Sequence, residues 1–253
     1  MRPRSGNWNL DRLTTQTTIR FDEVRAWMFG QALPLWVGMG LDLEHGGSVE
    51  CLDFSGHDAA RPIKRLRVQA RQVYAFSHAE ILGWDGPARA AADHCWDYLI
   101  GRGRREDGAF VRLLNRDGSV NDPTADAYDM AFAINACAWR IKAGDSAAMA
   151  VAHHTLDALD GLLGFGPGQG WGAAEDRPHE RLLNPHMHLL EATLAWREVE
   201  PGGIWDAMAD EVAELGLTKL MDRNGAIREF YSADWNPVAG AAGRSVEPGP
   251  QIE

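Results

Sequence analysis

Apolar residues recur at helical spacing in seven segments of this 253-residue chain, with glycine-rich turns between them. No regular alternation of strands with helices accompanies these segments, so the pattern does not predict a parallel sheet. Consecutive helices joined by short connections pack as antiparallel neighbours. We therefore predict an all-α fold in which residues 1–253 form a single domain of paired helices. The predicted helices cover residues 20–33, 64–83, 87–102, 124–143, 146–163, 185–199 and 203–222.

Short stretches between some of the helix pairs have the pattern of β-hairpins. Each combines alternating apolar residues with glycine or another turn-forming residue. The middle stretch contains Asp117-Gly118, which is a strong signal for a tight hairpin turn. The predicted hairpins cover residues 46–56, 108–120 and 225–237.

Charge and composition narrow the classes of partner and compartment. The formal net charge of −11 disfavours binding to nucleic acid or to an anionic membrane surface. The three cysteines are widely spaced, which favours a reducing compartment, and the first residues lack the apolar core of a signal peptide. No apolar run reaches the roughly 18 residues that a membrane span needs. We therefore expect a cytoplasmic protein, and its ten tryptophans favour stacking on sugar rings or at protein interfaces.

The segment NPHMH, which begins at Asn184, places two histidines at the head of an apolar run. Asn184 suits a helix N-cap and Pro185 suits the first turn, so a helix should begin here. Side chains two residues apart on a helix point about 200° away from each other, so His186 and His188 cannot easily bind one metal ion. Asn184, His188 and Glu191 instead share one helical face. This face is either a polar surface with one satisfied histidine or the wall of a site.

Two other predicted helices carry rows that admit both a structural and a functional interpretation. In residues 124–143, Tyr128 and Phe132 lie one turn apart among alanines, which is more often core than site. A row on residues 64–83 is typical of a solvated arginine face, although a tyrosine and a histidine on the same face favour a polar cavity. This row consists of Arg67, Arg71, Tyr74 and His78.

Five motifs, in order along residues 20–249, resemble the N-acylglucosamine 2-epimerase family and especially its mannose-isomerase-like members. The resemblance implies an (α/α)6 barrel with a site at one mouth, and isomerisation or 2-epimerisation of free sugars by proton transfer at C2 without a metal or other cofactor. Twelve helices need more than 253 residues, so we expect an incomplete, C-terminally truncated barrel of about seven helices with short hairpins. The motifs are RLRVQARQVYAFSHAEILGW, AYDMAFAINACAW, RLLNPHMHLLEATLAW, GAIREFYSADWNP and VEPG.

The resemblance also implies roles for individual residues. Arg71 matches the arginine that contacts the sugar oxygens near C1 and C2, and Tyr128 matches an aromatic residue of the cleft. Asn184 and His188 match residues that bind and polarise the substrate, so His188 is the expected catalytic residue. Trp235 is expected near the cleft as a further substrate-binding residue.

Two positions near the C-terminus bear on activity. In the family, a histidine follows the VEPG motif, and a glutamate comes three residues later. Glu253 matches this glutamate and is the second expected catalytic residue, whereas Pro250 stands where the histidine belongs. A further catalytic histidine, on a late helix of the family, has no counterpart here. We therefore expect weak or no activity toward a monosaccharide, and we expect His186 to pack or face away from the site.

Two other functions remain open from the sequence. The chain can be a non-catalytic, truncated sugar-binding or interaction fragment, and an open apolar flank would favour a homo-oligomer. It can also be an (α/α)6 glycosidase, which needs two carboxylates across a cleft. Asp126, Asp129 and Glu175 are available for that role, but their spacing singles out no acid–base pair.

Overall fold

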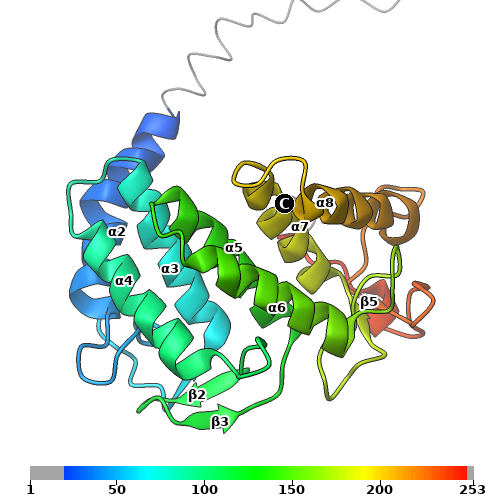
Figure 1. Cartoon of the computed structure of the whole chain (residues 1–253), viewed down its shortest axis with the longest axis horizontal. Helices are drawn as coiled ribbons and strands as arrows, with labels where there is room; N and C mark the ends of the chain where they lie inside the picture. The colour runs from blue at the N-terminus through cyan, green and yellow to red at the C-terminus, as the bar shows by residue number, and fades with distance from the viewer. Residues whose placement is uncertain (1–19, 250–253) are drawn as a thin grey trace, which may run out of the picture.

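The computed structural model describes residues 20–249, which are mostly helical (Figure 1). They form seven main helices, as predicted, and a short 3-10 helix at Ala242–Arg244 that was not predicted. The first helix ends at residue 40 instead of the predicted 33, and the other boundaries differ by three residues or fewer. The first helix spans residues 20–40 and includes α2 (Leu33–Leu35) between π-helical turns at Met28–Ala32 and Trp36–Gly40. Further π-helical turns, Leu99–Gly103 and Gly216–Leu220, extend α4 and α8. The other helices are α3 (Leu66–Ile81), α4 (Ala88–Tyr98), α5 (Ala127–Lys142), α6 (Ala148–Leu163), α7 (Leu183–Arg197) and α8 (Ile204–Leu215).

The helices are arranged as packed pairs (Figure 1). One row consists of α3, α5 and α7, in which α5 packs against both of the others. Each helix of this row carries a second helix, with α4 on α3, α6 on α5 and α8 on α7. This arrangement is the predicted incomplete (α/α)6 barrel.

The sequence of α5 suits its central place in this arrangement. Alanines recur along it and are buried, which lets the neighbouring helices approach closely. The side chain of Asp126 caps the N-terminus by accepting a hydrogen bond from the Tyr128 backbone N–H at 2.9 Å. Gly144, at φ +101°, follows the last turn and ends the helix in a conformation that suits glycine. The close-packing interpretation of this helix is therefore correct.

A three-stranded antiparallel sheet contains the predicted middle hairpin. Its strands are β1 (Ile63–Arg65), β2 (Leu113–Asn115) and β3 (Val120–Asp122), in that order. The turn between β2 and β3 uses Gly118 at φ +84°, as the Asp-Gly signal predicts.

The other two predicted hairpins differ from the structure. Residues 46–56 form a loop that takes part in isolated bridges and contains no strand. In residues 225–237, strand β5 (Phe230–Tyr231) pairs mainly with β4 (Arg181–Leu182), about 50 residues earlier in the chain. The reason is tertiary packing: Tyr231 is buried and its hydroxyl donates a hydrogen bond to the Leu220 carbonyl oxygen at 2.9 Å.

Strands and an isolated bridge hold the N-terminal ends of α3, α5 and α7 at one end of the molecule. Strand β1 runs directly into α3, and β4 runs directly into α7. The residue before α5, Asp126, forms an isolated bridge with Ala174. The starts of α3, α5 and α7 therefore meet at a common mouth.

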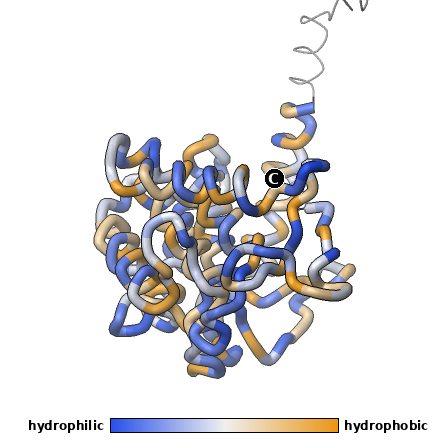
Figure 2. The backbone as a smooth tube through the Cα atoms, turned by 90° about the vertical axis from the view of Figure 1, so that its right-hand side faces the viewer, coloured by the Kyte–Doolittle hydropathy of each residue, from blue (hydrophilic) through white to orange (hydrophobic). Residues whose placement is uncertain are grey.

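Hydrophobic and hydrophilic residues alternate along the helices (Figure 2). Between residues 20 and 249, no helix is both long enough and apolar enough to cross a membrane. The main buried cluster instead lies among the paired helices, and a smaller cluster joins α7, α8 and β5.

Exposed apolar side chains lie on the first helix and on the α7–α8 side, and they predict self-association. Phe21, Trp27 and Leu217 are each more than half exposed, and Leu194 is nearly so. Apolar surfaces of this kind favour association. We expect the mass measured by light scattering to rise with concentration, and the double variant Trp27→Gln/Leu194→Gln to reduce that rise. Replacing Phe54, a lone exposed loop residue, by serine is the control; a wild-type monomer at every concentration would contradict the prediction.

Candidate active site

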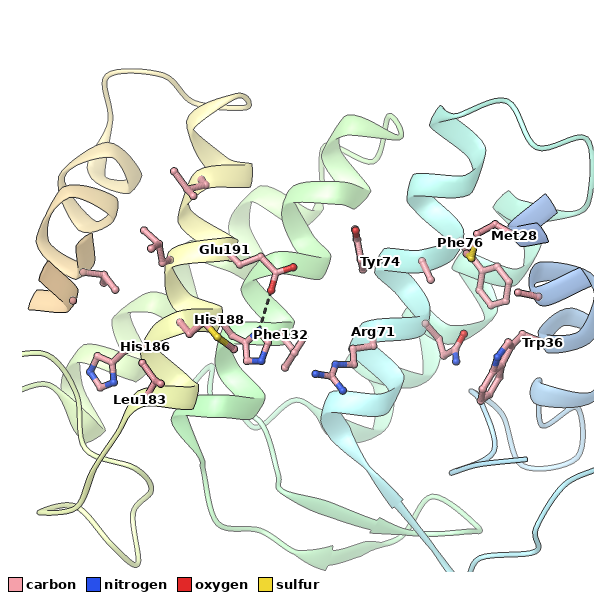
Figure 3. A pocket seen from close by; sticks show the side chains of 18 of the residues that line it. Met28, Trp36, Arg71, Tyr74, Phe76, Phe132, Leu183, His186, His188 and Glu191 are labelled. Carbon is pink, nitrogen blue, oxygen red and sulfur yellow. Dashed lines mark hydrogen bonds and ion pairs between the residues drawn. The ribbon is translucent and has the colours of Figure 1, made fainter. Parts of the chain in front are cut away.

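Two adjoining hollows lie between α3 and α7. The first, here called the apolar cavity, has a volume of about 900 Å³ and is lined mainly by apolar side chains (Figure 3). The second, here called the polar pocket, has a volume of about 580 Å³ and lies where α3, α5 and α7 begin. Arg71 lines both hollows. Further polar side chains of the polar pocket include Arg65, Arg67, Arg112, Asp126, Tyr128, Arg177, Asn184 and Glu229.

Arg71 presents hydrogen-bond donors that no carboxylate neutralises. Its Nη2 donates to the Tyr128 hydroxyl at 3.3 Å, and its guanidinium lies 4.2 Å from the centre of the Phe132 ring. Within residues 20–249 it forms no ion pair. A planar guanidinium in this state can donate two parallel hydrogen bonds to oxygens of a ligand.

His188 lies beside the same aromatic residues. Its ring centre is 4.4 Å from that of Phe132 and 5.1 Å from that of Tyr128. Its Nδ1 lies 2.9 Å from Glu191 Oε2, and because a carboxylate accepts hydrogen bonds, Nδ1 carries the hydrogen. In the neutral ring, Nε2 then has a free lone pair. Figure 3 shows Arg71 and His188 pointing toward each other from α3 and α7, with Phe132 between them.

Asn184 also lines the polar pocket, but it is not the N-cap of α7. The helix begins at Leu183, one residue before Asn184, because β4 runs directly into it and the Leu183 N–H donates to the Glu229 carbonyl oxygen at 3.0 Å. The N-cap is Leu182, which makes no capping hydrogen bond with its side chain. The N-cap prediction is therefore wrong. The buried Oδ1 of Asn184 has no partner among the described residues and is available to a ligand.

The structure places the other predicted site residues elsewhere. Trp235 is buried against Tyr231, donates its Nε1–H to the Gln169 carbonyl oxygen at 3.1 Å, and lines neither hollow. Glu253 and Pro250 lie outside the described residues. The apolar cavity and the polar pocket thus bring together four of the predicted site residues, namely Arg71, Tyr128, Asn184 and His188. Trp235 is not among them.

His186 borders the apolar cavity, but both of its ring nitrogens are occupied. Nδ1 donates to the Leu182 carbonyl oxygen at 2.7 Å, and Nε2 accepts from the Trp171 backbone N–H at 3.1 Å. Burial lowers the pKa of His186 to about 4. The ring therefore stays neutral and packs, as expected from the sequence.

This buried histidine predicts a loss of stability in acid. Between pH 6.5 and about 4 the unfolded chain binds a proton that folded His186 does not, so the free energy of unfolding falls as the pH falls, by roughly 3 kcal/mol in total. Burial raises the pKa values of Asp129 and Glu229 to about 7, and these groups act in the opposite direction. Urea unfolding from pH 4.5 to 8 measures the free energy of unfolding of wild type and of His186→Gln. In the variant, we expect the part of the acid-induced decrease that comes from His186 to be absent. The exposed His57→Gln variant is the control, and parallel curves for wild type and His186→Gln would contradict the prediction.

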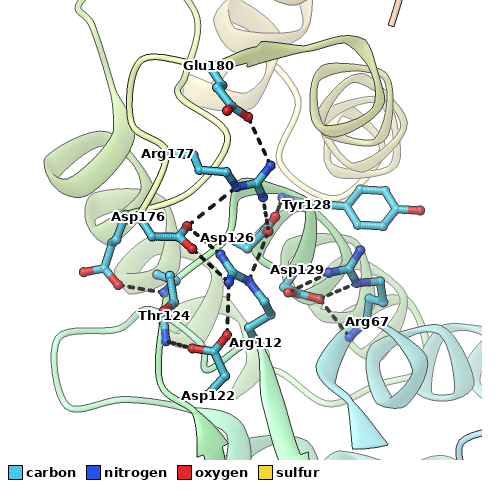
Figure 4. A network of polar contacts seen from close by, with 12 residues as sticks. Arg67, Arg112, Asp122, Thr124, Asp126, Tyr128, Asp129, Asp176, Arg177 and Glu180 are labelled. Atoms are coloured by element: carbon cyan, nitrogen blue, oxygen red, sulfur yellow. Dashed lines mark hydrogen bonds and ion pairs between the residues drawn. The ribbon is translucent and has the colours of Figure 1, made fainter. Parts of the chain in front are cut away.

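Arginines lie against all three carboxylates considered for a glycosidase, and Figure 4 shows the contacts of Asp126 and Asp129. Asp129 is fully buried and accepts from Arg67 Nε at 2.8 Å and Nη2 at 3.2 Å. Asp126 lies 3.5 Å from Arg112 and 3.6 Å from Arg177. The third carboxylate, Glu175, accepts from Arg105 at 2.6 Å. Ion pairing of this kind leaves no evident acid–base pair, and the described residues contain no group of three or more acidic, His or Cys side chains arranged to hold a metal ion.

The sequence analysis missed Glu229 in the polar pocket. A usable signal was present, because side chains alternate between the two faces of a strand. Glu229 comes two residues before the buried Tyr231, so this alternation places its carboxylate on the inward face. A carboxylate at an inward position of a strand is uncommon unless it is paired.

Solved structures show which proteins share this fold. The cellobiose 2-epimerase from Spirochaeta thermophila DSM 6192 superposes with a TM-score of 0.81 at 23% identity, over 90% of this chain and 60% of that one. A D-mannose isomerase superposes with a TM-score of 0.75 at 22% identity, over 82% of this chain and 54% of that one. The fold is thus that of the (α/α)6 sugar epimerases and isomerases.

Sequence comparison gives the family. The model of the family described as N-acylglucosamine 2-epimerase (GlcNAc 2-epimerase) matches residues 46–253, and the chain belongs to this family. It is 38% identical over 236 residues to a mannose-6-phosphate isomerase of Rhizobium meliloti (strain 1021), and 29% identical over 230 residues to a D-mannose isomerase of Thermobifida fusca. The chain spans 61% and 54% of the lengths of these two relatives.

Proposed function

We propose that this chain binds a free aldose or ketose between α3 and α7 and acts on it as an isomerase or 2-epimerase, by proton transfer at C2. The observation that carries the proposal is the unpaired guanidinium of Arg71, joined to the Tyr128 hydroxyl and facing His188. Family membership and the isomerase and epimerase relatives support the same chemistry.

The proposed reaction starts from the open-chain sugar. Nε2 of neutral His188 takes the proton from C2, the electron pair of the C2–H bond forms a C1=C2 double bond, and the carbonyl π electrons move to O1. Arg71 stabilises the negative charge on O1, which is the type of interaction that lowers such barriers most. Return of the proton from His188 to C1, with transfer of the O2 proton to O1 as the C2=O bond forms, gives the ketose. Return to the opposite face of C2 gives the epimer and needs a second proton donor.

We further propose that the rate is low. His186 and His188 are the histidines that line the two hollows, and both nitrogens of His186 are occupied. Loss of one proton-transfer group typically costs a factor of about 10²–10⁴ in rate. Glu253 stays a proposed second catalytic group, and a non-catalytic sugar-binding or interaction fragment stays the second candidate function. The extensive apolar lining beside the site favours that second candidate.

Deuterium exchange at C2 tests this proposal. Mannose is incubated with a high concentration of the chain in deuterated buffer, and proton NMR follows each carbon-bound proton. In wild type, we expect slow loss of the signal of the proton on C2 and of no other carbon-bound proton. We expect no such loss with His188→Gln. The exposed His57→Gln variant is the matched control. Sugar binding without exchange would select the fragment as the function, and release of alcohol from an aryl mannoside would instead support a glycosidase.

A further inference from the structure

A carboxylate without an ion-pair partner borders the polar pocket. Glu229 is only 6% exposed and lines the pocket together with Arg71, Tyr128 and Asn184. Among the described residues it forms no ion pair within 4 Å, and its Oε2 has no hydrogen-bond partner. Leaving a buried acceptor without a donor costs roughly 1–3 kcal/mol, and more when the group is charged.

The backbone fixes Glu229 beside the start of α7. Its carbonyl oxygen accepts from the Leu183 N–H at 3.0 Å, and its own N–H donates to the Ser245 carbonyl oxygen at 3.2 Å. The Asn184 backbone N–H lies near the Glu229 carboxylate and lowers its pKa. The backbone of Glu229 is therefore held beside the first turn of α7, and the Oε2 atom of its side chain has no hydrogen-bond partner among the described residues.

The neighbouring carboxylates differ from Glu229. Asp126 lies close to two arginines, and Asp129 is held by Arg67. The polar pocket thus contains two charged side chains that have no ion-pair partner among the described residues. They are the guanidinium of Arg71 and the carboxylate of Glu229. A neutral ligand with several hydroxyl groups complements both, because each hydroxyl can donate to the carboxylate or accept from the arginine.

We propose that Glu229 is a sugar-binding residue, whose free carboxylate oxygen accepts hydrogen bonds from hydroxyl groups of the monosaccharide. The inference rests on the proposed function, since it assigns a further residue to the same sugar site. It differs from a purely structural role, in which Glu229 serves only as an acceptor for the first turn of α7.

The proposal predicts a pH dependence of sugar binding. Burial raises the pKa of Glu229 to about 7, with a further contribution from Glu247, while the Asn184 N–H acts in the opposite direction. Hydroxyl donors favour the charged carboxylate, so sugar should bind more tightly as the pH rises through 7, and binding should release protons. The other charged or titratable groups of the pocket and its edges are Arg65, Arg67, Arg71, Arg112, Asp126, Tyr128, Asp129, Arg177, His188 and Glu247.

Isothermal titration of the whole chain with mannose from pH 6 to 8 tests the proposal. Glu229→Gln keeps the size of the side chain and an oxygen for the Asn184 N–H, so it isolates the carboxylate. We expect this variant to bind mannose about tenfold or more weakly than wild type at pH 8, as for loss of a hydrogen bond to a charged group, with little dependence on pH. Glu44→Gln, which changes an exposed carboxylate that lines neither hollow, is the matched control.

The outcomes separate this inference from the proposed function. If Glu229→Gln binds mannose with the same affinity and the same pH dependence as wild type, the inference is wrong but the proposed function stands. Glu229 would then serve only as an acceptor for α7. Absence of mannose binding by wild type at every pH would overturn both. Should Glu229→Gln not fold, wild type is titrated near pH 7 in buffers of different ionisation enthalpy. Proton release on binding supports the inference, and no release contradicts it.

Discussion

The 253-residue chain is expected to convert mannose to fructose about 10²–10⁴ times more slowly than the D-mannose isomerase of Thermobifida fusca. The resemblance to the family motif places a histidine at the position of Pro250, and proline has neither a titratable side chain nor a backbone N–H. Of the two histidines that line the hollows, only His188 has a nitrogen available for proton transfer. A single base can move the proton from C2 to C1, but no second acid–base group then assists the proton transfer between O2 and O1.

Fructose formation by the two proteins, measured by NMR at equal concentrations, checks this expectation. Pro250→His should raise the rate of the chain, because it restores an acid–base group, and Pro250→Ala should leave the rate unchanged. A wild-type rate within tenfold of the relative would contradict the expectation and would show that the residues present form a sufficient site.

Replacing Trp196 by alanine is expected to lower the free energy of unfolding by about 3–5 kcal/mol. Trp196 is fully buried, and its indole stacks on that of Trp205 at 4.6 Å between ring centres with an interplanar angle of 19°. Its Nε1–H donates to the Ile134 carbonyl oxygen at 2.9 Å, which ties α7 to α5. The variant therefore loses packing, ring stacking and a buried hydrogen bond at the centre of the paired helices.

Thermal and urea unfolding measure this loss, and for a chain of this size we expect the midpoint to fall by roughly 10 °C. Trp196→Phe should lose less, because a ring still fills most of the space. The control is Trp27→Ala, since Trp27 is 53% exposed and its removal leaves a smaller cavity. Equal stability of Trp196→Ala and Trp27→Ala would contradict the described packing.

The sequence predicted the main helices well because the pattern that specifies each helix lies within its own segment. Apolar residues at helical spacing, bounded by turn residues, predicted the seven main helices of the described range, although not the short 3-10 helix Ala242–Arg244 or the full length of the first helix. The Asp-Gly turn fixed the hairpin between β2 and β3 for the same reason. Arg71, Tyr128 and His188 could be selected because their motifs are long, and helix geometry then determined which of their neighbours share a face.

The errors concern interactions between distant segments. Asn184 has the local chemistry of an N-cap, but pairing of β4 with β5 begins α7 earlier. Trp235 follows its motif but turns into a core with Tyr231, with a positive φ of +61°. Alternation before Tyr231 marks Glu229 as inward-facing, but its place beside the first turn of α7 follows from the pairing of β5 with β4. Such contacts depend on tertiary packing, which no local pattern reports.

Titration of the chain with mannose, in wild type and in Arg71→Met, tests the central claim that a sugar binds where Arg71, Tyr128, Asn184 and His188 meet. Methionine keeps much of the side-chain length but removes every guanidinium donor. The account predicts saturable binding of one sugar by wild type, and binding at least about tenfold weaker in Arg71→Met, since its hydrogen bonds involve a charged group. Arg89→Met, which changes an exposed arginine of α4, should bind as wild type does. Equal affinity of Arg71→Met and wild type, or no saturable binding by wild type, would contradict the account.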